Sequence, residues 1–327
     1  MIEIQEIEKG IFTFPVVLPD NPLKWLNCYI IKGDSGSRNL LIDSGFHRKE
    51  CTRTLFDGIK ALNLSPEDSD IFFTHLHSDH TGNGYELFRR GYKIMMSETD
   101  YKILTETSQT NMSVRGVRLG IPADLIDTVV SHNPGLNYAS QHFEARFIRD
   151  GDILSCGGRK LRCLHMPGHT PGLYCLYDEA NGVLFSSDHV LFDITPNIVS
   201  WTGYSDSLGK YLESLQKVRK YNVRLCLPAH RTDGGKTMQR RVDEITAHHA
   251  RRLNETFENV CRHPGRSAYE VAQDVKWHIR ARNWEEFPTG QKWFAVGETL
   301  AHLEHLQAES LLTYEINDAG AFIWYKK

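Results

Sequence analysis

His75-Leu76-His77-Ser78-Asp79-His80 is the most informative stretch of this 327-residue sequence, because it places three imidazoles and one carboxylate within six residues. The hexapeptide follows the apolar run 70–74, which is typical of a buried strand, and precedes the glycine-rich segment 81–84. We therefore expect it to form a loop in which His75 and His77 bind one metal ion while Asp79 and His80 turn toward another. Imidazole and carboxylate together suit zinc, iron or manganese. The alternative is a solvated polar loop.

Four further polar residues stand at the ends of predicted strands or in turns between them. His169 lies in the turn 166–172, Asp188 follows the apolar run 183–187, and His230 follows a run that ends at Leu227. Each of them, taken alone, is more often a structural residue than a ligand. Asp43 also ends a predicted strand, and we expect it to fix a turn or to support a ligand rather than to bind metal.

The order of these motifs resembles the metallo-β-lactamase superfamily over about residues 10–235. An H-x-H-x-D-H loop is followed by a histidine in a P-G-H-T-P-G turn, an aspartate after a strand, and P-A-H. The resemblance implies an α/β fold, a four-layer αββα sandwich with the metal site at one edge of its sheets. Carried over by position, His75, His77 and His169 bind the first ion. Asp79, His80 and His230 bind the second, and Asp188 bridges the two.

Within the superfamily, the sequence is similar to the lactamase-beta-2-like and glyoxalase-II-like hydrolases. Asp188-His189-Val190, followed by the segment 194–198, resembles the former group. Di-iron oxidoreductases of the superfamily usually carry Glu at the position of His77, so the histidine favours hydrolysis over electron transfer. The large insertion of the β-CASP nucleases is missing between Asp188 and His230.

The chain divides into a predicted catalytic domain, 1–235, and a tail, 236–327. In the first, strands are expected at 10–14, 27–31, 39–43, 70–74, 92–96, 160–165, 173–177, 182–186 and 223–227, and helices at 49–62, 83–90 and 205–221. Residues 98–146 are predicted to be a helical insertion, either a lid over the metals or a surface decoration.

The tail begins with a predicted linking helix at 236–260. A capping box opens a helix at Ser267 with Val271, Val275 and Ile279 inward, a helix is expected over 297–309, and strands over 311–316 and 321–325. Helices followed by a terminal hairpin resemble a small α+β winged-helix-like domain. A hairpin turn is also predicted at 33–36.

Composition sets further limits. Hydrophobic residues make up 40% and charged residues 24%, and the net charge of −3 does not resemble the balance of a nucleic-acid-binding protein. Seven cysteines without a C-x-x-C pair argue against a disulfide framework and against a zinc ribbon. The sequence opens without a signal-peptide pattern, and no run of about 18 apolar residues exists. We therefore predict a cytoplasmic protein with no membrane partner.

These features predict a metallo-hydrolase that uses two divalent ions, zinc first and iron or manganese as alternatives, and a metal-bridging hydroxide. Asp79 and Asp188 are the predicted catalytic groups. The expected substrate is a small thioester, ester or lactone, and an anionic one, because residues 217–252 hold ten basic residues against three acids. Predicted substrate contacts are His189, Tyr138, Trp201 and Tyr204. The alternatives are a structural role for His189 beside Asp188 and core packing for the three aromatic side chains.

Two other functions stay open. The winged-helix-like tail favours a single-strand-specific endoribonuclease, in which nucleic acid is the partner. A non-catalytic metal-binding interaction protein is the other alternative. The tail itself can serve a homodimer or cover the pocket, and we rank both above nucleic-acid binding.

Overall fold

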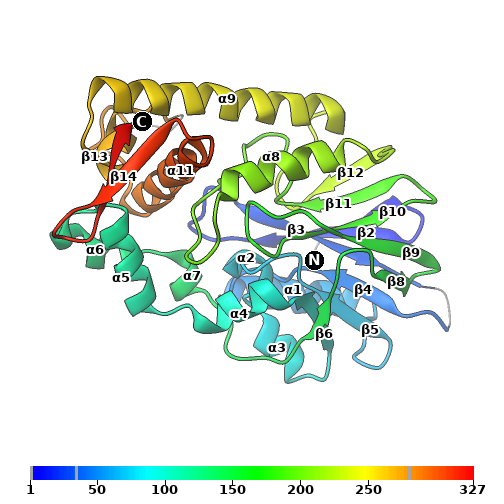
Figure 1. Cartoon of the computed structure of the whole chain (residues 1–327). Helices are drawn as coiled ribbons and strands as arrows, with labels where there is room; N and C mark the ends of the chain where they lie inside the picture. The colour runs from blue at the N-terminus through cyan, green and yellow to red at the C-terminus, as the bar shows by residue number, and fades with distance from the viewer. Residues whose placement is uncertain (1–2, 34–35, 278–280) are drawn as a thin grey trace.

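Two β-sheets face each other in the computed structural model, and helices cover both outer faces (Figure 1). The structure describes residues 3–33, 36–277 and 281–327. From outside to inside and out again, the layers are helix, sheet, sheet and helix. The predicted αββα sandwich with a small C-terminal α+β segment is therefore confirmed.

The first sheet holds seven strands in the order of the chain. They are β1 (Gln5–Glu8), β2 (Ile11–Val17), β3 (Trp25–Ile31), β4 (Asn39–Ile42), β5 (Ser69–Phe72), β6 (Lys93–Ser97) and β7 (Arg146–Ile148). Strands β1 to β4 pair antiparallel, and β4 to β7 pair parallel. The sequence did not predict β1, which is mostly polar, or β7, which has only three residues.

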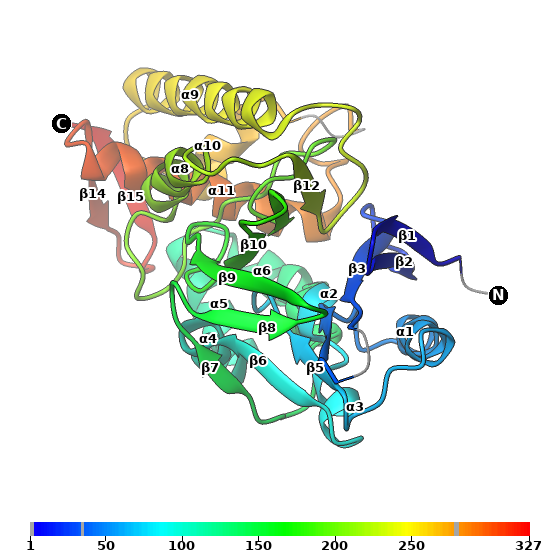
Figure 2. The same ribbon diagram turned by 90° about the vertical axis from the view of Figure 1, so that its right-hand side faces the viewer.

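The second sheet has the order β12-β11-β10-β9-β8. Its strands are β8 (Ile153–Cys156), β9 (Arg159–His165), β10 (Tyr174–Asp178), β11 (Val183–Ser187) and β12 (Leu225–Pro228). The inner faces of the two sheets enclose one apolar core, in which the rings of Tyr29 and Phe185 meet edge to face at 5.5 Å. Figure 2 shows the green strands β8 and β9 beside β5, β6 and β7 of the first sheet.

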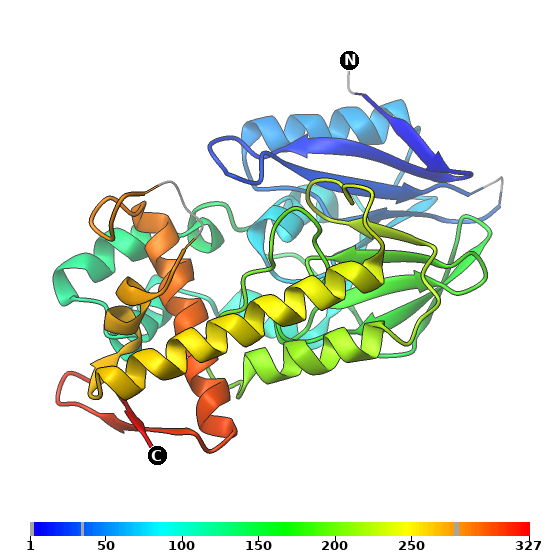
Figure 3. The same ribbon diagram turned by 90° about the horizontal axis from the view of Figure 1, so that it is seen from above.

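Helices α1 (Lys49–Ala61) and α3 (Gly84–Phe88) pack on the first sheet, and α8 (Ser207–Val218) and α9 (Met238–Arg262) on the second. In α1, Cys51, Leu55 and Ile59 recur every four residues and are buried, so one stripe of the helix faces the sheet. Figure 3 shows α9, in yellow, running from the second sheet toward the tail.

The predicted insertion forms four helices, α4 (Glu98–Glu106), α5 (Gln109–Arg118), α6 (Ala123–Ser131) and α7 (Pro134–Asn137). The tail continues after α9 with β13 (Arg266–Ser267), α10 (Ala268–Asp274), α11 (Thr289–Ala308), β14 (Leu312–Ile316) and β15 (Phe322–Lys326). Leu119, Ile126 and Val130 of the insertion lie in one buried cluster with Trp293 and Trp324 of the tail. The insertion and the tail therefore share a core, which lies beside the sheets in Figure 1.

Several predicted elements of the tail have different bounds in the structure. The capping box at Ser267 is present, but its helix ends at Asp274, and Val275 is buried beyond the helix end. Helix α11 begins at Thr289 rather than at 297, because the amphipathic pattern is weak where the helix is buried on most sides. Ile279, and residues 34–35 of the predicted turn, lie outside the described residues.

The limits of the two domains and the likeness to a winged helix stay predictions. None of the helices in the described ranges combines the length and the apolar character that spanning a bilayer requires.

Candidate metal centre

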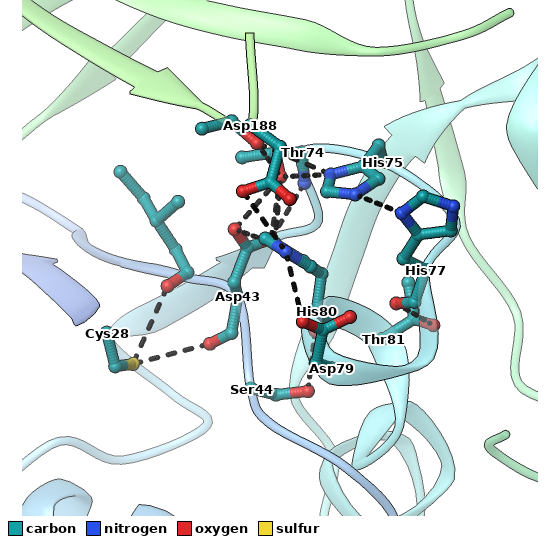
Figure 4. Close-up of polar contacts among 12 residues, drawn as sticks. Cys28, Asp43, Ser44, Thr74, His75, His77, Asp79, His80, Thr81 and Asp188 are labelled. Atoms are coloured by element: carbon teal, nitrogen blue, oxygen red, sulfur yellow. Dashed lines mark hydrogen bonds and ion pairs between the residues drawn. The ribbon is translucent and has the colours of Figure 1, made fainter. Parts of the chain in front are cut away.

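The hexapeptide lies directly beyond β5, at the edge where strands of both sheets end (Figure 4). Its first half is a loop as predicted, but its second half is the one-turn helix α2 (Ser78–Thr81). The turn ends at Gly82, where a Cβ would lie 2.4 Å from the backbone nitrogen of His47. The helical turn separates Asp79 and His80 from His75 and His77, so the two pairs face different positions.

The other predicted ligands follow strands of the second sheet. His169 lies in the connection between β9 and β10, Asp188 follows β11, and His230 follows β12. Gly168 has φ 136°, and a Cβ there would lie 2.4 Å from the Cα of Tyr211, so only glycine brings this turn against α8. The three connections meet the hexapeptide at one edge of the sandwich.

A first group of donor atoms comes from His75, His77, His169 and Asp188. His77 Nδ1 lies 3.0 Å from His75 Nε2 and 3.0 Å from His169 Nε2. Asp188 Oδ2 lies 3.5 Å from His169 Nε2. All four donor atoms lie within 4.8 Å of one another, which is the spacing that one shared cation requires.

A second group comes from Asp79, His80 and His230. Asp79 Oδ2 lies 3.3 Å from His230 Nε2 and 3.8 Å from His80 Nε2. The second oxygen of Asp188, Oδ1, lies 3.5 Å from His230 Nε2 and 3.7 Å from His80 Nε2. Asp188 therefore presents one carboxylate oxygen to each group.

Three atoms around this second position lack a hydrogen-bond partner within the described protein. His80 Nε2, His230 Nε2 and Asp188 Oδ1 are buried and make no hydrogen bond. Such atoms cost about 1–3 kcal/mol each unless something binds them. A cation satisfies all three, so these His and Asp groups fit a site for two metal ions.

Protonation also suits cation binding. Burial lowers the pKa of His77 to about 4 and that of His169 to about 3, so both imidazoles are neutral at neutral pH and have a free lone pair. Burial lowers the pKa of His80 too, but the charges of Asp43, Asp79 and Asp188 outweigh it and raise the pKa to about 10. The same concentration of negative charge attracts a cation.

The remaining nitrogens of four imidazoles are held by the protein. His80 Nδ1 lies 2.8 Å from Asp43 Oδ2, and Asp43 also accepts a hydrogen bond from the backbone nitrogen of Thr74. His75 Nδ1 faces the hydroxyl of Thr74, His169 Nδ1 donates to the carbonyl of Asn197, and His230 Nδ1 donates to that of Trp25. These bonds orient each ring and fix which nitrogen faces the other donor atoms. Asp43 thus supports His80 and belongs to neither donor group.

Sequence reasoning missed two positioning residues, Asp100 and Glu298. The buried carboxylate of Asp100 accepts from the backbone nitrogens of Leu76 and Gly172 and from the hydroxyl of Thr170, so it joins the hexapeptide to the turn of His169. Glu298 of α11 accepts from the side chain of Asn197 at 2.7 Å. Neither lies in a motif, and only the folded chain brings them to the site.

The predicted substrate contacts lie in different surroundings. Trp201 is beside the donor atoms, because its Nε1 donates to the carbonyl of His169 and its ring lies 6.0 Å from that of His77. Tyr204 forms an isolated β-bridge with Trp201. The ring of Tyr138 packs at a tilt against that of Phe46, with 4.9 Å between the ring centres, at the edge of the first sheet's outer core.

His189 lies away from solvent. Its side chain is fully buried, and its ring packs at 5.4 Å against Tyr211 of α8. A role for His189 at the substrate stays a prediction.

Acids neutralise the predicted basic surface in part. Seven of the ten basic residues between 217 and 252 form ion pairs: Lys217, Arg219, Arg224, Lys236, Arg240, Arg241 and Arg252. Their partners include acids from outside this segment, such as Glu8 and Asp150, but three of the seven share the one carboxylate of Glu244. The excess of positive charge is therefore smaller than a count within the segment suggests, and an anionic substrate stays a prediction.

A sandwich whose loops gather five imidazoles and two carboxylates into two adjoining groups is the architecture of a metal-dependent hydrolase. The model of the metallo-beta-lactamase superfamily matches residues 26–230, well over half of the chain. The chain belongs to this superfamily, and it is a hydrolase.

Curated relatives and solved structures agree with this placement. The chain is 28% identical to the acyl-coenzyme A thioesterase MBLAC2 of Gallus gallus, over 62% of this chain and 72% of that protein. It is 25% identical to an atrochrysone carboxyl ACP thioesterase of Emericella nidulans, over 65% of this chain and 54% of that protein.

Among solved structures, a metallo-beta-lactamase family protein of Thermus thermophilus has a TM-score of 0.79 at 25% identity, covering 98% of this chain and 100% of that one. A beta-lactamase domain protein of Burkholderia ambifaria has a TM-score of 0.82 at 24% identity, covering 99% and 94%. Both similarities extend over the tail, so the arrangement of sandwich and tail occurs in other proteins.

Proposed function

We propose that the protein hydrolyses thioesters of small acids and binds two divalent cations, zinc in the first instance. The observation that carries the proposal is the placement of Asp188, which directs one oxygen to each of two groups of buried donor atoms. Curated relatives named as acyl-coenzyme A and acyl-carrier-protein thioesterases support the choice of substrate. Hydrolysis consumes one water, breaks the carbon–sulfur bond, and yields a carboxylic acid and a thiol.

Two divalent cations, when bound, would lower the pKa of a bound water and would polarise the thioester carbonyl. His75, His77, His169 and Asp188 would hold the first cation, and Asp79, His80, His230 and Asp188 would hold the second. Asp79 has a further role, because it keeps a small exposed fraction of 8% whereas His80 and His230 have none. In this proposal it is therefore the group that orients the attacking water.

The protein also shapes the approach to this site. Trp201 forms one wall, held to the metal loop by its bond to the carbonyl of His169. Helix α11 of the tail supports the same wall, because Glu298 binds Asn197 and the carbonyl of Gly297 accepts from the backbone nitrogen of Ser200. In this proposal, the tail and the insertion cap the site and exclude bulk water from the reaction.

The test is a panel assay of the metal-loaded protein with acyl thioesters, lactones and single-stranded RNA, together with metal analysis. Thioester hydrolysis is expected, with loss of activity and of one metal equivalent in Asp79→Ala. Asp127→Ala, an exposed acid of α6, is the matched control and keeps both. Thioesters left intact while RNA is cleaved would establish the endoribonuclease instead. Full turnover and two ions in Asp79→Ala would remove Asp79 from the mechanism.

A further inference from the structure

Arg115 belongs to helix α5 of the insertion, yet its side chain lies close to the metal centre. Its guanidinium carbon lies over two indole rings, 5.6 Å from the ring centre of Trp201 and 5.3 Å from that of Trp293. Trp201 in turn lies 6.0 Å from the ring of His77. One indole ring therefore separates a fixed positive charge from a proposed metal ligand.

The five N–H bonds of an arginine point outward in the plane of the guanidinium and form its hydrogen-bonding edge. A cation–π contact with an indole ring does not by itself satisfy them. Nη2 of Arg115 is buried and has no hydrogen-bond partner. Within the described ranges, no carboxylate lies at ion-pair distance from Arg115. A structural clamp alone leaves this buried edge unsatisfied, which is costly for a charged group.

Glu304 of α11 is the acid whose charge acts on Arg115, but it does not neutralise it. Its Oε1 accepts from the hydroxyl of Ser200 at 2.9 Å, and its Oε2 is buried without a partner. Burial raises the pKa of Glu304 to about 7, so a large share of this carboxyl is neutral near neutral pH. The desolvated guanidinium of Arg115 is thus not balanced by the partly ionised Glu304, and an anion from outside the protein can balance its charge.

We infer that Arg115 binds a carboxylate carried by the acyl half of the substrate, a short distance from the scissile carbonyl. The inference rests on the proposed thioesterase function and narrows its substrate to acyl groups with a carboxylate of their own. The Trp201 ring centre lies 6.0 Å from the ring centre of His77 and 5.6 Å from the guanidinium carbon of Arg115. The distance from the guanidinium to the His77 ring therefore cannot exceed the sum of these two distances. The phosphates of coenzyme A are too remote, because the whole pantetheine arm separates them from the sulfur.

The test compares matched thioesters with the metal-loaded full chain. Succinyl and butyryl thioesters have acyl chains of equal length and differ in the terminal carboxylate. Each is made on N-acetylcysteamine, which carries no phosphate, and on coenzyme A. Arg115→Met removes the charge and keeps much of the bulk, Arg115→Lys keeps the charge without the fork, and Arg118→Met alters an exposed arginine of the same helix.

The wild type is expected to favour succinyl over butyryl N-acetylcysteamine by roughly 10- to 100-fold in kcat/KM, the worth of a charge-assisted hydrogen bond. In Arg115→Met the ratio falls toward one, in Arg115→Lys it is intermediate, and in Arg118→Met it equals that of the wild type. Thermal unfolding of each variant identifies one that has failed to fold, and Arg115→Lys then carries the comparison.

A second measurement is independent of turnover. Succinate titrated into metal-free protein by calorimetry is expected to bind the wild type and Arg118→Met, and to bind Arg115→Met at least about tenfold more weakly. Equal hydrolysis of succinyl and butyryl thioesters overturns the inference and leaves the thioesterase function in place. The inference is also overturned if Arg115→Met lowers kcat/KM for both coenzyme A thioesters and for neither N-acetylcysteamine thioester. If no thioester is hydrolysed, the proposed function fails, and succinate binding alone decides the role of Arg115.

Discussion

Replacing Asp43 by Asn tests whether Asp43 fixes the tautomer of His80 and thereby the affinity of the second metal position. Asp43 has φ 63°, a left-handed conformation that Asn tolerates, so the substitution keeps the backbone and nearly the shape. One amide oxygen continues to accept from the backbone nitrogen of Thr74, where the distance is 2.9 Å. The amide group then faces His80 Nδ1, which lies 2.8 Å from Asp43 Oδ2.

Two donors cannot face each other at that distance, so His80 must accept at Nδ1 and carry its proton on Nε2. Nε2 is the atom that lies among Asp79, Asp188 and His230, and a protonated nitrogen binds no cation. The lost charge-assisted bond is worth about 1.5–3 kcal/mol, which corresponds to roughly 10- to 150-fold in affinity for the second ion. The first group contains no atom bonded to Asp43 and should keep its ion.

Competition with a chromophoric chelator measures both affinities, and metal analysis after dialysis gives the stoichiometry. Asp70→Asn is the matched control, because Asp70 lies on β5 and pairs with Arg38 away from the donor groups. Two ions of unchanged affinity in Asp43→Asn would refute the tautomer argument. Equal weakening of both ions would show instead that Asp43 holds the whole edge together.

Three further substitutions test the surroundings of the site. Gly168→Ala places a Cβ 2.4 Å from the Cα of Tyr211, at a residue with φ 136°. We expect the free energy of unfolding in urea to fall by at least about 1–3 kcal/mol and the first ion to bind more weakly, and unchanged stability would contradict this. Glu298→Ala removes a carboxylate that lies 3.4 Å from the buried guanidinium of Arg252, so the unfolding free energy should fall by roughly 3 kcal/mol. The variant also loses the hydrogen bond to Asn197 and should have a lower kcat/KM; an unchanged kcat/KM would show that Asn197 needs no support from the tail. Glu304 has a raised pKa in the folded chain, so its stabilising contribution is complete below about pH 4.5 and is lost as the pH rises through about 7. Glu304→Gln should therefore make the unfolding free energy less dependent on pH in this window, and an unaltered pH dependence would be evidence against the burial of this carboxyl.

The apolar runs of the sequence indicated a sandwich of two sheets, and the resemblance to the superfamily supplied the order of its layers and the assignment of the ligands. Each candidate ligand directly follows a strand or a tight turn, and strands reveal themselves through apolar runs bounded by glycine and proline. Asp188 after β11 and His230 after β12 are therefore placed as soon as the strands are. Strands β1, β7 and β8 lacked that signal, because they are short or partly exposed edge segments whose pairing depends on their neighbours.

The residues that surround the proposed ligands could not be predicted in the same way. Asp100 stands in the first turn of α4, where an acid is ordinary, and its three bonds to the metal loops follow from how the insertion packs. The burial of His189 under α8 could not be predicted either, since nothing in the local sequence indicates that this helix covers it. Contacts of this kind join segments far apart in sequence, and local patterns do not carry them.

The tail also helps to position the site, through contacts between segments that are far apart in the sequence. Residues 197–201 are held on one side by His169, which donates to the carbonyl of Asn197 and accepts from Trp201 through its own carbonyl. On the other side, α11 holds the same segment at Asn197 and Ser200 through Glu298, Gly297 and Glu304. A shift of α11 must therefore move either this segment or the ring of His169. Since α11 also shares a core with α5 and α6, the orientation of a proposed metal ligand depends on how the insertion and the tail pack together. A catalytic unit cut before α9 would retain all seven proposed ligands and lose the contacts that orient them.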